Sequence, residues 1–279
     1  MTVETFAPES PFRRVTHELL GAVPGRHRAV VVPTTDGVVA GMAHAVPDAI
    51  GEPAGSWTHL RRDGDQVEAG EPLVAVEGTA LEIMIASDHV LGGLGFAGGV
   101  AACAMRIQTA APPGLAIVCG AWKKLPVAMK PYLRAALDVA GVGHRLVAGP
   151  FVYVDKNAVR LAGGIEAATA ASVALDHGPV SVQVVSVDEA LRAVAAGAGI
   201  VMVDTGVPAD LSAVDAALRA ADRRDDVLVA FGGGVRGTDI RDLRRRGAQI
   251  VDIGRAVLDA PLWDLRLEVV VRSNVEVRE

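Results

Sequence analysis

The residues best suited to bind a phosphate group lie in two glycine-containing loops near the C-terminal end of the sequence. Gly232, Gly233 and Gly234 follow one apolar run, and Gly254 with Arg255 follows the next. Glycine lets backbone N–H groups approach a ligand closely, and a helix that begins just afterwards points its positive dipole end at the same place. We interpret these residues as a phosphate cradle. The alternative is that the glycines only permit tight strand-to-helix turns.

Charged residues lie next to several other apolar runs. Lys123 follows one run, and His144 and Arg145 precede the next. Lys156 and Asp204 follow two further runs. If these loops meet at the carboxyl edge of one sheet, they form a basic pocket in an acidic chain, with Asp204 as its main acid. Such a pocket would suit a ligand with two phosphate groups.

Each of these residues also has a purely structural interpretation. Lys123 could be solvated, and Lys156 could form an ion pair with a neighbouring aspartate. His144 with Arg145 could cap a helix C-terminus, where the dipole favours positive charge. Asp204 could cap the N-terminus of the helix that follows it.

The order of apolar runs after residue 115 predicts a parallel sheet covered by helices. Val- and Ile-rich runs alternate there with amphipathic segments, which is typical of β–α units. The predicted strands are Leu115–Cys119, Arg145–Asp155, Val180–Ser186, Ile200–Asp204, Val227–Phe231 and Gln249–Ile253. The predicted helices are Val127–Ala140, Gly164–Asp176, Val187–Ala196, Ala209–Arg223 and Thr238–Arg246.

The region before residue 110 has a different texture and predicts a separate α/β domain. Strand-like runs occupy His27–Glu82, with a compact hairpin at Asp63–Gly78, and a helical stretch follows over Ile83–Thr109. We therefore place an N-terminal α/β domain at 1–109 and a (β/α) domain at 110–261. The final segment, 262–279, contains a strand-like run, Leu265–Val271, that could return to the N-terminal sheet.

Composition excludes several classes of function. A net charge of −6 with 4% aromatic residues argues against nucleic-acid binding. The N-terminus has no apolar core typical of a signal peptide. The most apolar window, Val90–Met105, is shorter than the roughly 20 residues that span a bilayer, and its glycines predict close packing on another helix, such as one across a subunit interface. We therefore expect a cytoplasmic protein that binds no membrane.

The two cysteines, Cys103 and Cys119, lie in apolar surroundings without metal-ligand spacing, which predicts buried free thiols in a reducing compartment. Because Cys119 ends a predicted strand, a nucleophilic role is the alternative.

Motifs along most of the chain resemble the quinolinate phosphoribosyltransferase family, the decarboxylating nicotinate-nucleotide pyrophosphorylases. The likeness runs from about Ala54 to Val270. DGDQVEAGEPLVAVEG is similar to the family's N-terminal signature, and AGGVAA to its S-G-I-A-T helix. WKKLPVAMK stands where the family has R-K-T-T-P-G-L-R, and GVGHR resembles G-G-x-N-H-R. VDKNA, VSVQVV and VDTG correspond to I-K-D-N-H, I-E-V-E-V-E and L-D-N, while GGGV and DIGRA match the family's phosphate loops.

The resemblance implies a fold and an assembly. The family has an N-terminal α/β domain and an open (β/α)6 barrel of the type II phosphoribosyltransferase kind. It forms an obligate homodimer in which each active site borrows residues from the neighbouring subunit.

The resemblance also implies roles for individual residues. Lys123, His144, Arg145 and Asp204 occupy family positions, and Lys156 is displaced by one. The family arginines that hold the two quinolinate carboxylates are replaced by Asp88, Trp122 and Met129. The acidic pair of the E-V-E strand becomes Ser181 and Gln183.

These exchanges predict a different acceptor from that of the family. Loss of the arginines removes bidentate carboxylate recognition, whereas Trp122 and Met129 offer a flat apolar surface for an acceptor ring. Loss of two acids weakens the case for tightly bound Mg²⁺, for which Asp204 remains the candidate ligand. No organic cofactor is predicted.

We therefore expect a divergent phosphoribosyltransferase that uses phosphoribosyl pyrophosphate and a small acceptor other than quinolinate. Two alternatives remain open at this point. One is a lyase, isomerase or aldolase acting on a phosphorylated substrate through a lysine Schiff base. The other is a non-catalytic phosphosugar or nucleotide binder, because fold alone does not fix function.

Overall fold

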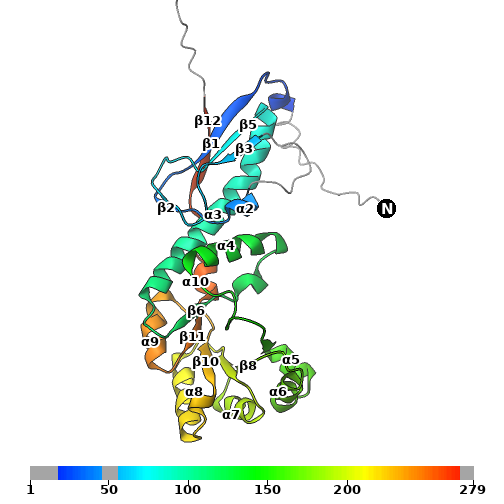
Figure 1. Cartoon of the computed structure of the whole chain (residues 1–279), viewed down its shortest axis with the longest axis vertical. Coiled ribbons are helices and arrows are strands. Elements are labelled where there is room, and N and C mark those ends of the chain that lie inside the picture. Colours follow the sequence, from blue (N-terminus) through cyan, green and yellow to red (C-terminus); the bar gives the residue numbers. More distant parts are fainter. Residues whose placement is uncertain (1–17, 46–55, 271–279) are drawn as a thin grey trace, which may run out of the picture. The chain divides into compact units, whose positions relative to one another are not determined.

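The computed structural model describes residues 18–45 and 56–270, without the side chains of residues 86, 88 and 89. The chain divides into two compact units, 1–99 with 262–279, and 100–261. The boundary lies inside the long helix α3, Ala80–Ala110, ten residues before the boundary that the sequence suggested. Figure 1 gives the order of the elements in each unit.

The first unit is built on an antiparallel sheet with the strand order β12-β1-β5-β3. These strands are β1 (His27–Pro33), β3 (Ser56–His59), β5 (Val74–Gly78) and β12 (Leu265–Val270). A small ladder joins β2 (Gly37–Val38) to β4 (Gln66–Val67), and α2 covers Met42–Ala45. β12 pairs along the whole free edge of β1, so the C-terminal strand completes the N-terminal sheet.

The glycines of α3 pack against a tryptophan of the same unit. A Cβ on Gly98 would lie 2.5 Å from the ring of Trp263 and 3.1 Å from the carbonyl oxygen of Val38. The backbone N–H of Trp263 also donates to the carbonyl of Gly95 at 2.8 Å. The expectation that the glycines of this window face another helix is therefore wrong for Gly95 and Gly98, which make room for Trp263.

The length of α3 also corrects the argument about membranes. Among the described residues, this one helix is long and apolar enough to span a bilayer, since it has 31 residues. However, 56% of its most apolar window is buried within the structure, as in a core helix. Burial, and not length, is therefore the property that distinguishes α3 from a typical span.

The second unit contains a six-stranded parallel sheet with the order β6-β11-β10-β9-β8-β7. The strands are β6 (Ala116–Val118), β7 (Val152–Val154), β8 (Val180–Val184), β9 (Ile200–Val203), β10 (Leu228–Phe231) and β11 (Ile250–Asp252). The first two strands of this unit along the chain, β6 and β7, occupy the opposite edges of the sheet. This confirms the α/β class and the parallel sheet.

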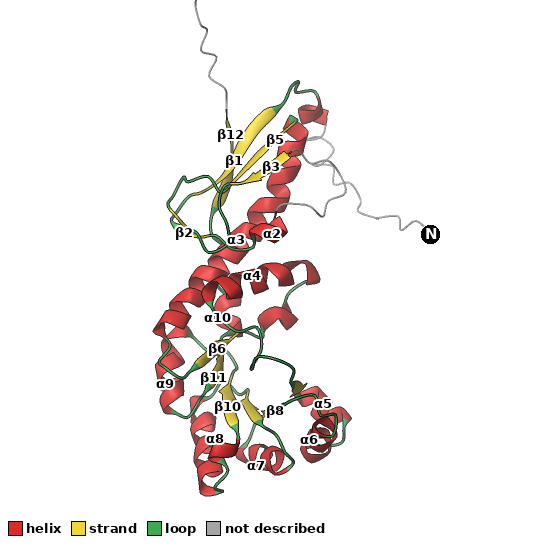
Figure 2. Ribbon diagram, in the orientation of Figure 1, coloured by secondary structure: helices red, strands yellow, loops and turns green. Residues whose placement is uncertain are grey.

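Helices follow each strand, as the sequence pattern predicts, and Figure 2 shows them around the outside of the strands. They are α4 (Lys130–Ala140), α5 (Lys156–Leu161), α6 (Ile165–Val173), α7 (Val187–Ala195), α8 (Pro208–Ala220), α9 (Ile240–Arg245) and α10 (Gly254–Leu258). Short 3₁₀ turns are η1 (Ala121–Lys124), η2 (Val127–Met129), η3 (Arg224–Asp226) and η4 (Gly237–Asp239).

One predicted strand was too long. The run 145–155 forms a strand only over β7, and residues 144–149 form bends instead. Glycine and proline at Gly149 and Pro150 interrupt the run, and Gly149 has a φ of 81° that a strand does not accommodate. The bends bring the side chains of this segment over the end of the sheet, where the candidate site lies.

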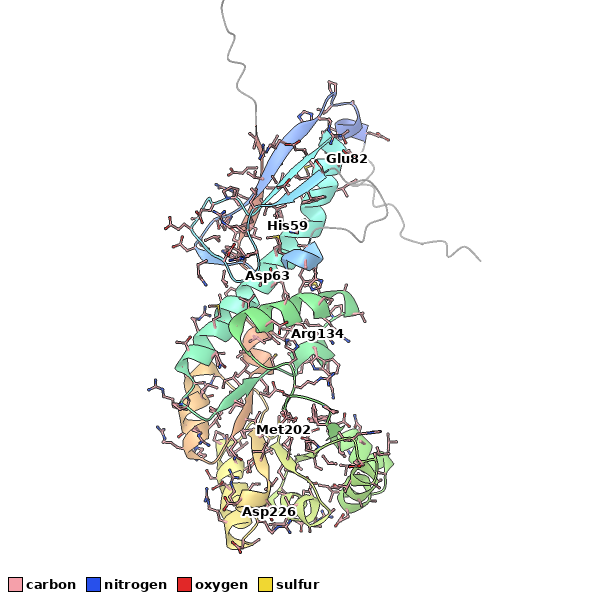
Figure 3. All side chains as sticks on the ribbon, in the orientation of Figure 1. His59, Asp63, Glu82, Arg134, Met202 and Asp226 are labelled. Atoms are coloured by element: carbon pink, nitrogen blue, oxygen red, sulfur yellow. The ribbon has the colours of Figure 1, made fainter. Side chains whose placement is uncertain are left out.

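The inner face of the sheet carries a hydrophobic cluster. Its buried members are Val118, Leu146, Ile200, Met202, Ala230 and Ile250, with Val147, Phe151 and Tyr153 packed against it. Figure 3 labels Met202 near the middle of this unit. Because side chains alternate along a strand, residues two positions beyond these core residues point to the same face, at the carboxyl ends of the strands.

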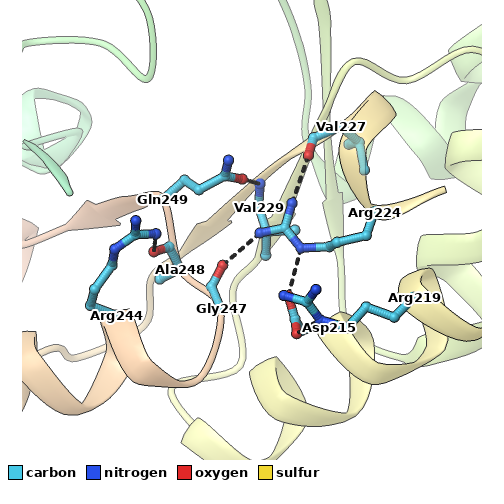
Figure 4. A network of polar contacts seen from close by, with 9 residues as sticks. All are labelled: Asp215, Arg219, Arg224, Val227, Val229, Arg244, Gly247, Ala248 and Gln249. Carbon is cyan, nitrogen blue, oxygen red and sulfur yellow. Dashed lines mark hydrogen bonds and ion pairs between the residues drawn. The ribbon is translucent and has the colours of Figure 1, made fainter. Parts of the chain in front are cut away.

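The opposite end of the sheet is held by a network around Arg224, shown in Figure 4. The guanidinium of Arg224 pairs with Asp215 of α8 and donates to the carbonyls of Val227, at 3.1 Å, and Gly247, at 2.9 Å. Both charged side chains are largely buried. The network thereby joins α8, the start of β10 and the loop before β11 at the amino ends of the strands.

Candidate active site

Two carboxylates flank a glycine at the carboxyl edge of the parallel sheet. β10 pairs in register with β9 and β11 up to Phe231. The next residue on each strand, Asp204, Gly232 and Asp252, therefore lies at the same level, and each follows a core residue by two positions. A Cβ on Gly232 would lie 3.2 Å from Oδ1 of Asp204 and 3.6 Å from Cβ of Asp252. The terminal methyl group of Met202 occupies the place that this Cβ would take, so glycine lets Met202 pack beside the two acids.

Asp204 is held by a glutamine from the neighbouring strand. Nε2 of Gln183 donates to Oδ2 of Asp204, and the backbone N–H of Lys156 donates to Oε1 of Gln183 at 3.1 Å. Burial raises the pKa of Asp204, although Lys156 and Lys124 partly oppose this. Asp204 does not cap α8, whose N-cap residue is Val207 without a side-chain hydrogen bond. The capping alternative is therefore wrong.

Asp252 is a site residue that the sequence reasoning missed. Its Oδ1 accepts hydrogen bonds from the backbone N–H groups of Gly120, at 3.1 Å, and Gly254, at 2.9 Å. Burial raises its pKa, the two amides lower it, and the charge of Asp204 raises it further. The signal was present in the sequence, because Asp252 ends an apolar run directly before a glycine loop, as Asp204 does.

A cavity of about 350 Å³ opens beside these carboxyl ends. The residues that line it come from β6 and the turn after it, from the bends before β7, and from three further strands. They are Val118, Gly120, Trp122, Lys123, His144, Arg145, Leu146, Phe151, Tyr153, Met202 and Asp252. The cavity therefore combines three basic side chains with an apolar wall and one carboxylate.

Lys123 reaches over the cavity from η1. Its Nζ lies 3.8 Å from Oδ2 of Asp155 and 4.8 Å from the ring centroid of Tyr153. The side chain remains 52% exposed. Tyr153 has a pKa raised to about 12 by burial and by three aspartates, so its hydroxyl stays protonated. Lys123 is thus a positioned cation, and within the described residues it is Lys123, not Lys156, that forms the ion pair with Asp155.

His144 and Arg145 line the same cavity. Nε2 of His144 lies 2.9 Å from Oδ1 of Asp138 in the last turn of α4, although the geometry is not that of a hydrogen bond. Arg145 is exposed, and no ion pair or hydrogen bond of its side chain occurs within the described residues. Gly141 in the left-handed conformation ends α4 itself. Arg145 is therefore a cation left free for an anionic ligand.

The two predicted acceptor residues have different positions. Trp122 lines the cavity, and the ammonium groups of Lys123 and Lys130 lie 5.8 Å and 5.6 Å from its ring centroid. Met129 ends η2 and is not among the residues that line this cavity. The side chain of Asp88, the third position of altered carboxylate recognition, lies outside the described part of the chain.

In the glycine loop after β10, two glycines pack closely against neighbouring residues and one has open space beside it. Gly233, with a φ of 95°, packs its backbone against Gly206 of the loop after β9, and a Cβ would lie 2.5 Å from the Gly206 nitrogen. The N–H of Gly206 donates to the carbonyl of Gly232. Gly234 faces open space. The structural explanation therefore accounts for all three glycines, because Gly234 also has a positive φ, of 71°, but Gly234 is exposed and accessible to a ligand.

The loop after β11 contains the other two residues that are predicted to bind a phosphate, Gly254 and Arg255. The amide of Gly254 is already engaged by Asp252, and Arg255 is largely exposed and pairs with Asp259 at 2.9 Å. Assignment of both residues to a phosphate stays a prediction, since a ligand would have to compete for these partners.

Cys119 cannot serve as a ready nucleophile. The residue is fully buried at the end of β6, and burial raises the pKa of its thiol to about 12. The thiolate, which is the reactive form, is thereby disfavoured. Cys103 is also a free thiol. Within the described residues, no group of three or more His, Cys, Asp or Glu side chains is placed to hold a metal.

Comparison with known families identifies the chain. The family model described as quinolinate phosphoribosyl transferase, C-terminal domain, matches residues 100–268, which is more than half of the sequence. The chain belongs to this family. The quinolinate phosphoribosyltransferase family consists of phosphoribosyltransferase enzymes, so the predicted resemblance and enzyme class are confirmed.

Individual members of the quinolinate phosphoribosyltransferase family show the extent of the similarity. The chain is 28% identical over 264 residues to a probable nicotinate-nucleotide pyrophosphorylase (carboxylating) from Methanothermobacter thermautotrophicus, covering 92% of this chain and 94% of the relative. It is 27% identical over 226 residues to the nicotinate-nucleotide pyrophosphorylase (carboxylating) of Rattus norvegicus, covering 80% and 74%.

Solved structures agree with the fold. The nicotinate-nucleotide pyrophosphorylase from Francisella tularensis matches with a TM-score of 0.70 at 20% identity, over 95% of this chain and 98% of the other. The enzyme of that name from Pyrococcus furiosus also has a TM-score of 0.70, at 19% identity, over 97% and 78%. At such identities the likeness concerns the fold.

Proposed function

We propose that the protein transfers the ribosyl-5-phosphate group of phosphoribosyl pyrophosphate to a small acceptor other than quinolinate and releases pyrophosphate. The observation that carries this proposal is the cavity at the carboxyl edge, where Lys123, His144 and Arg145 gather in a chain with a net charge of −6. Membership of a phosphoribosyltransferase family supports the same donor. The scaffold would be an open (β/α)6 barrel in a homodimer with shared sites.

The basic side chains would bind the diphosphate that leaves. Lys123, His144 and Arg145 line one cavity and would stabilise the charge that develops on the departing pyrophosphate. Lys156, whose side chain is exposed at the same edge of the sheet, would add to this field. Fixed cations act mainly by positioning and by electrostatic stabilisation of the transition state.

The opposite end of the donor would be held by the glycine loops. Gly234 offers an open backbone position after β10, and Gly254 and Arg255 begin α10. These residues would hold the 5-phosphate, with Gly232 and Gly233 shaping the loop. Asp204 would bind ribose hydroxyls. Asp204 also fits Mg²⁺, which proteins commonly hold through one or two carboxylates and substrate phosphates.

The acceptor would differ from quinolinate because the cavity favours an apolar ring over two carboxylates. Trp122 lines the cavity together with Phe151, Tyr153 and Met202, and a partly buried carboxylate, Asp252, lies among them. An additional carboxylate on the acceptor would be repelled by this acid. Met129 would contribute to the acceptor site only if η2 moves toward the cavity.

Calorimetric titration with phosphoribosyl pyrophosphate, with and without Mg²⁺, tests the donor. Quinolinate is the parallel ligand, and Arg245→Ala on α9, which removes an exposed cation away from the cavity, is the matched control. We expect micromolar binding of the donor, unchanged in the control and weakened in Arg145→Ala, with no binding of quinolinate. Absence of donor binding in both conditions would overturn the proposal, and tight binding of quinolinate would overturn its acceptor part.

The Schiff-base alternative receives no support from Lys123. A lysine nucleophile needs its ammonium group desolvated or placed beside another cation. The Lys123 side chain is instead half-exposed and paired with the carboxylate of Asp155.

A further inference from the structure

Asp252 has the position of a group that reacts with a ligand. It ends β11 on the inner face of the sheet and lines the cavity, together with Trp122, Phe151 and Tyr153. Among the side chains that line this cavity, Asp252 is the single carboxylate. An acid amid aromatic walls is unexpected in a pocket that binds only anions.

The orientation of the Asp252 carboxylate is fixed by backbone groups. Oδ1 accepts from the amides of Gly120 and Gly254, which belong to the loops after β6 and β11. Among the described residues, none donates a hydrogen bond to Oδ2. A Cβ on Gly120 would lie 2.8 Å from Oδ2, so glycine at that position leaves this oxygen uncovered. One oxygen thus anchors the group, and the other remains available to a ligand.

A carboxylate with a free oxygen beside an apolar wall recognises a hydrogen-bond donor on an uncharged ring. It repels a ring carboxylate and attracts an N–H group. Burial raises the pKa of Asp252, the amides of Gly120 and Gly254 and the charge of Lys124 lower it, and Asp204 raises it. The net pKa is raised, so the ionised form is a stronger base than an exposed carboxylate.

We propose that Asp252 is the general base of the transfer, and that the acceptor is a neutral aromatic ring with an ionisable ring N–H, such as an azole. This inference rests on the proposed phosphoribosyl transfer. The acceptor nitrogen forms a bond to C1 of the ribose while the bond from C1 to the diphosphate oxygen breaks. Pyrophosphate leaves with the electron pair, and the ring N–H proton passes to Oδ2 of Asp252.

The chemistry distinguishes this acceptor class from pyridines. A pyridine nitrogen has no proton to lose and would not need a base, whereas an azole that gains a ribosyl group must lose its N–H proton. The diphosphate would bind to the basic residues of the cavity, Lys123, His144 and Arg145. The acceptor would bind next to Asp252.

The test measures pyrophosphate release with phosphoribosyl pyrophosphate and three acceptors: benzimidazole, nicotinate and quinolinate. We expect kcat/KM for benzimidazole to exceed that for quinolinate at least about tenfold. A quinolinate carboxylate next to Asp252 would be a charge without a partner, and a loss of binding of about this size is typical of an unpaired charge. For benzimidazole, kcat/KM should fall toward low pH as Asp252 becomes protonated.

Asp252→Asn is the deciding variant, because its amide oxygen can still accept from Gly120 and Gly254. We expect benzimidazole turnover to fall on the order of 10²- to 10⁴-fold, with loss of the acid limb of the pH profile. Calorimetric binding of phosphoribosyl pyrophosphate and thermal unfolding, measured on the same variant, report whether the fold and the donor site persist. If Asp252→Asn has lost its fold, the acceptor panel and pH profile of the wild-type protein still decide.

The outcomes separate the two proposals. Wild-type protein that does not bind phosphoribosyl pyrophosphate contradicts the proposed function itself. Wild-type protein that binds the donor but prefers quinolinate, or an Asp252→Asn variant with wild-type turnover and pH profile, overturns the role of Asp252 and leaves phosphoribosyl transfer standing.

Discussion

Lys123 illustrates how one residue takes its properties from several elements. It lies on η1, but its ammonium group is directed by Asp155 at the end of β7 and by the ring of Tyr153 within that strand. The ammonium group therefore lies over the cavity on a half-exposed side chain. The contribution of Lys123 to catalysis depends on the negative charge that develops beside it in the transition state.

Replacement of Lys123 by alanine tests this contribution to catalysis. We expect Lys123→Ala to lower kcat/KM on the order of 10²-fold, because one preorganised cation is lost from the leaving diphosphate. Steady-state rates of pyrophosphate release measure the effect, with Arg245→Ala as the control of equal charge change. Equal rates in Lys123→Ala and wild type would remove Lys123 from the site.

A second prediction at the residue scale concerns the stability of the fold at acid pH. Burial alone would raise the pKa of Asp215, but hydrogen bonds from Arg219 and Arg224 hold it below its usual value. A carboxylate with a lowered native pKa stabilises the fold fully above its unfolded pKa, near ~3.9, and this stabilisation is lost as pH falls toward the native pKa.

Asp215→Asn should therefore make the free energy of unfolding less dependent on pH below about pH 5. Urea unfolding at a series of pH values between neutral and acid measures the slope. An unchanged slope in the variant would show that other carboxylates dominate the acid response.

At the scale of elements, the Arg224 network connects three segments at the amino ends of the strands (Figure 4). Arg224→Ala leaves Asp215 buried without its inner partner and frees the carbonyls of Val227 and Gly247. Loss of one member of a buried pair typically costs about 3–5 kcal/mol, and we expect a loss of this order in urea unfolding.

Arg219→Ala is the matched control, because Arg219 pairs with the same carboxylate from an exposed position. We expect its unfolding midpoint to stay close to that of the wild type. Equal effects of the two variants would contradict the importance of burial and of the two carbonyl contacts.

Helix α3 offers a comparison of two glycines within one element. Gly98→Ala would press a methyl group against the Trp263 ring and the Val38 carbonyl, and overpacking of this kind costs about 1–3 kcal/mol. Gly92 faces open space, so Gly92→Ala should stabilise the helix by about 0.5–1 kcal/mol. Thermal unfolding should shift in opposite directions, and a shift in the same direction would contradict the packing described here.

At the scale of the whole molecule, the first unit is assembled from both ends of the sequence. β12 pairs with β1 over the stretch Arg28–Pro33, so the sheet of this unit is complete only after the chain of the second unit has been synthesised. The contacts that complete it are therefore of long sequence separation, which slows folding.

The expected homodimer is a prediction at this scale. Light scattering coupled to gel filtration should give twice the 28.8 kDa of one chain. Because shared sites take residues from both subunits, a mixture of two inactive variants altered on opposite sides of the interface should regain activity. A monomer with full transferase activity would contradict the shared site.

Much of the architecture follows from the sequence alone. Alternation of apolar runs with amphipathic segments is a local property, since each run must bury its side chains and each helix one face. This pattern determined that the sheet is parallel and in what order strands and helices follow one another along the chain. The positions of Lys123 and Asp204 after strand ends follow from the same pattern, whereas His144 and Arg145 reach the cavity from bends where a strand was expected.

Other features were decided by the tertiary structure, because they depend on which strands become neighbours. Gly232 is required only because β9 flanks β10 and packs the Met202 side chain against it, and Asp204 and Asp252 meet at its level because β9 and β11 are its neighbours. Gly98 is required only because Trp263, far along the chain, packs on it. Hydrophobic periodicity assigns a residue to a face, whereas its partner on that face is set by the register and order of the strands.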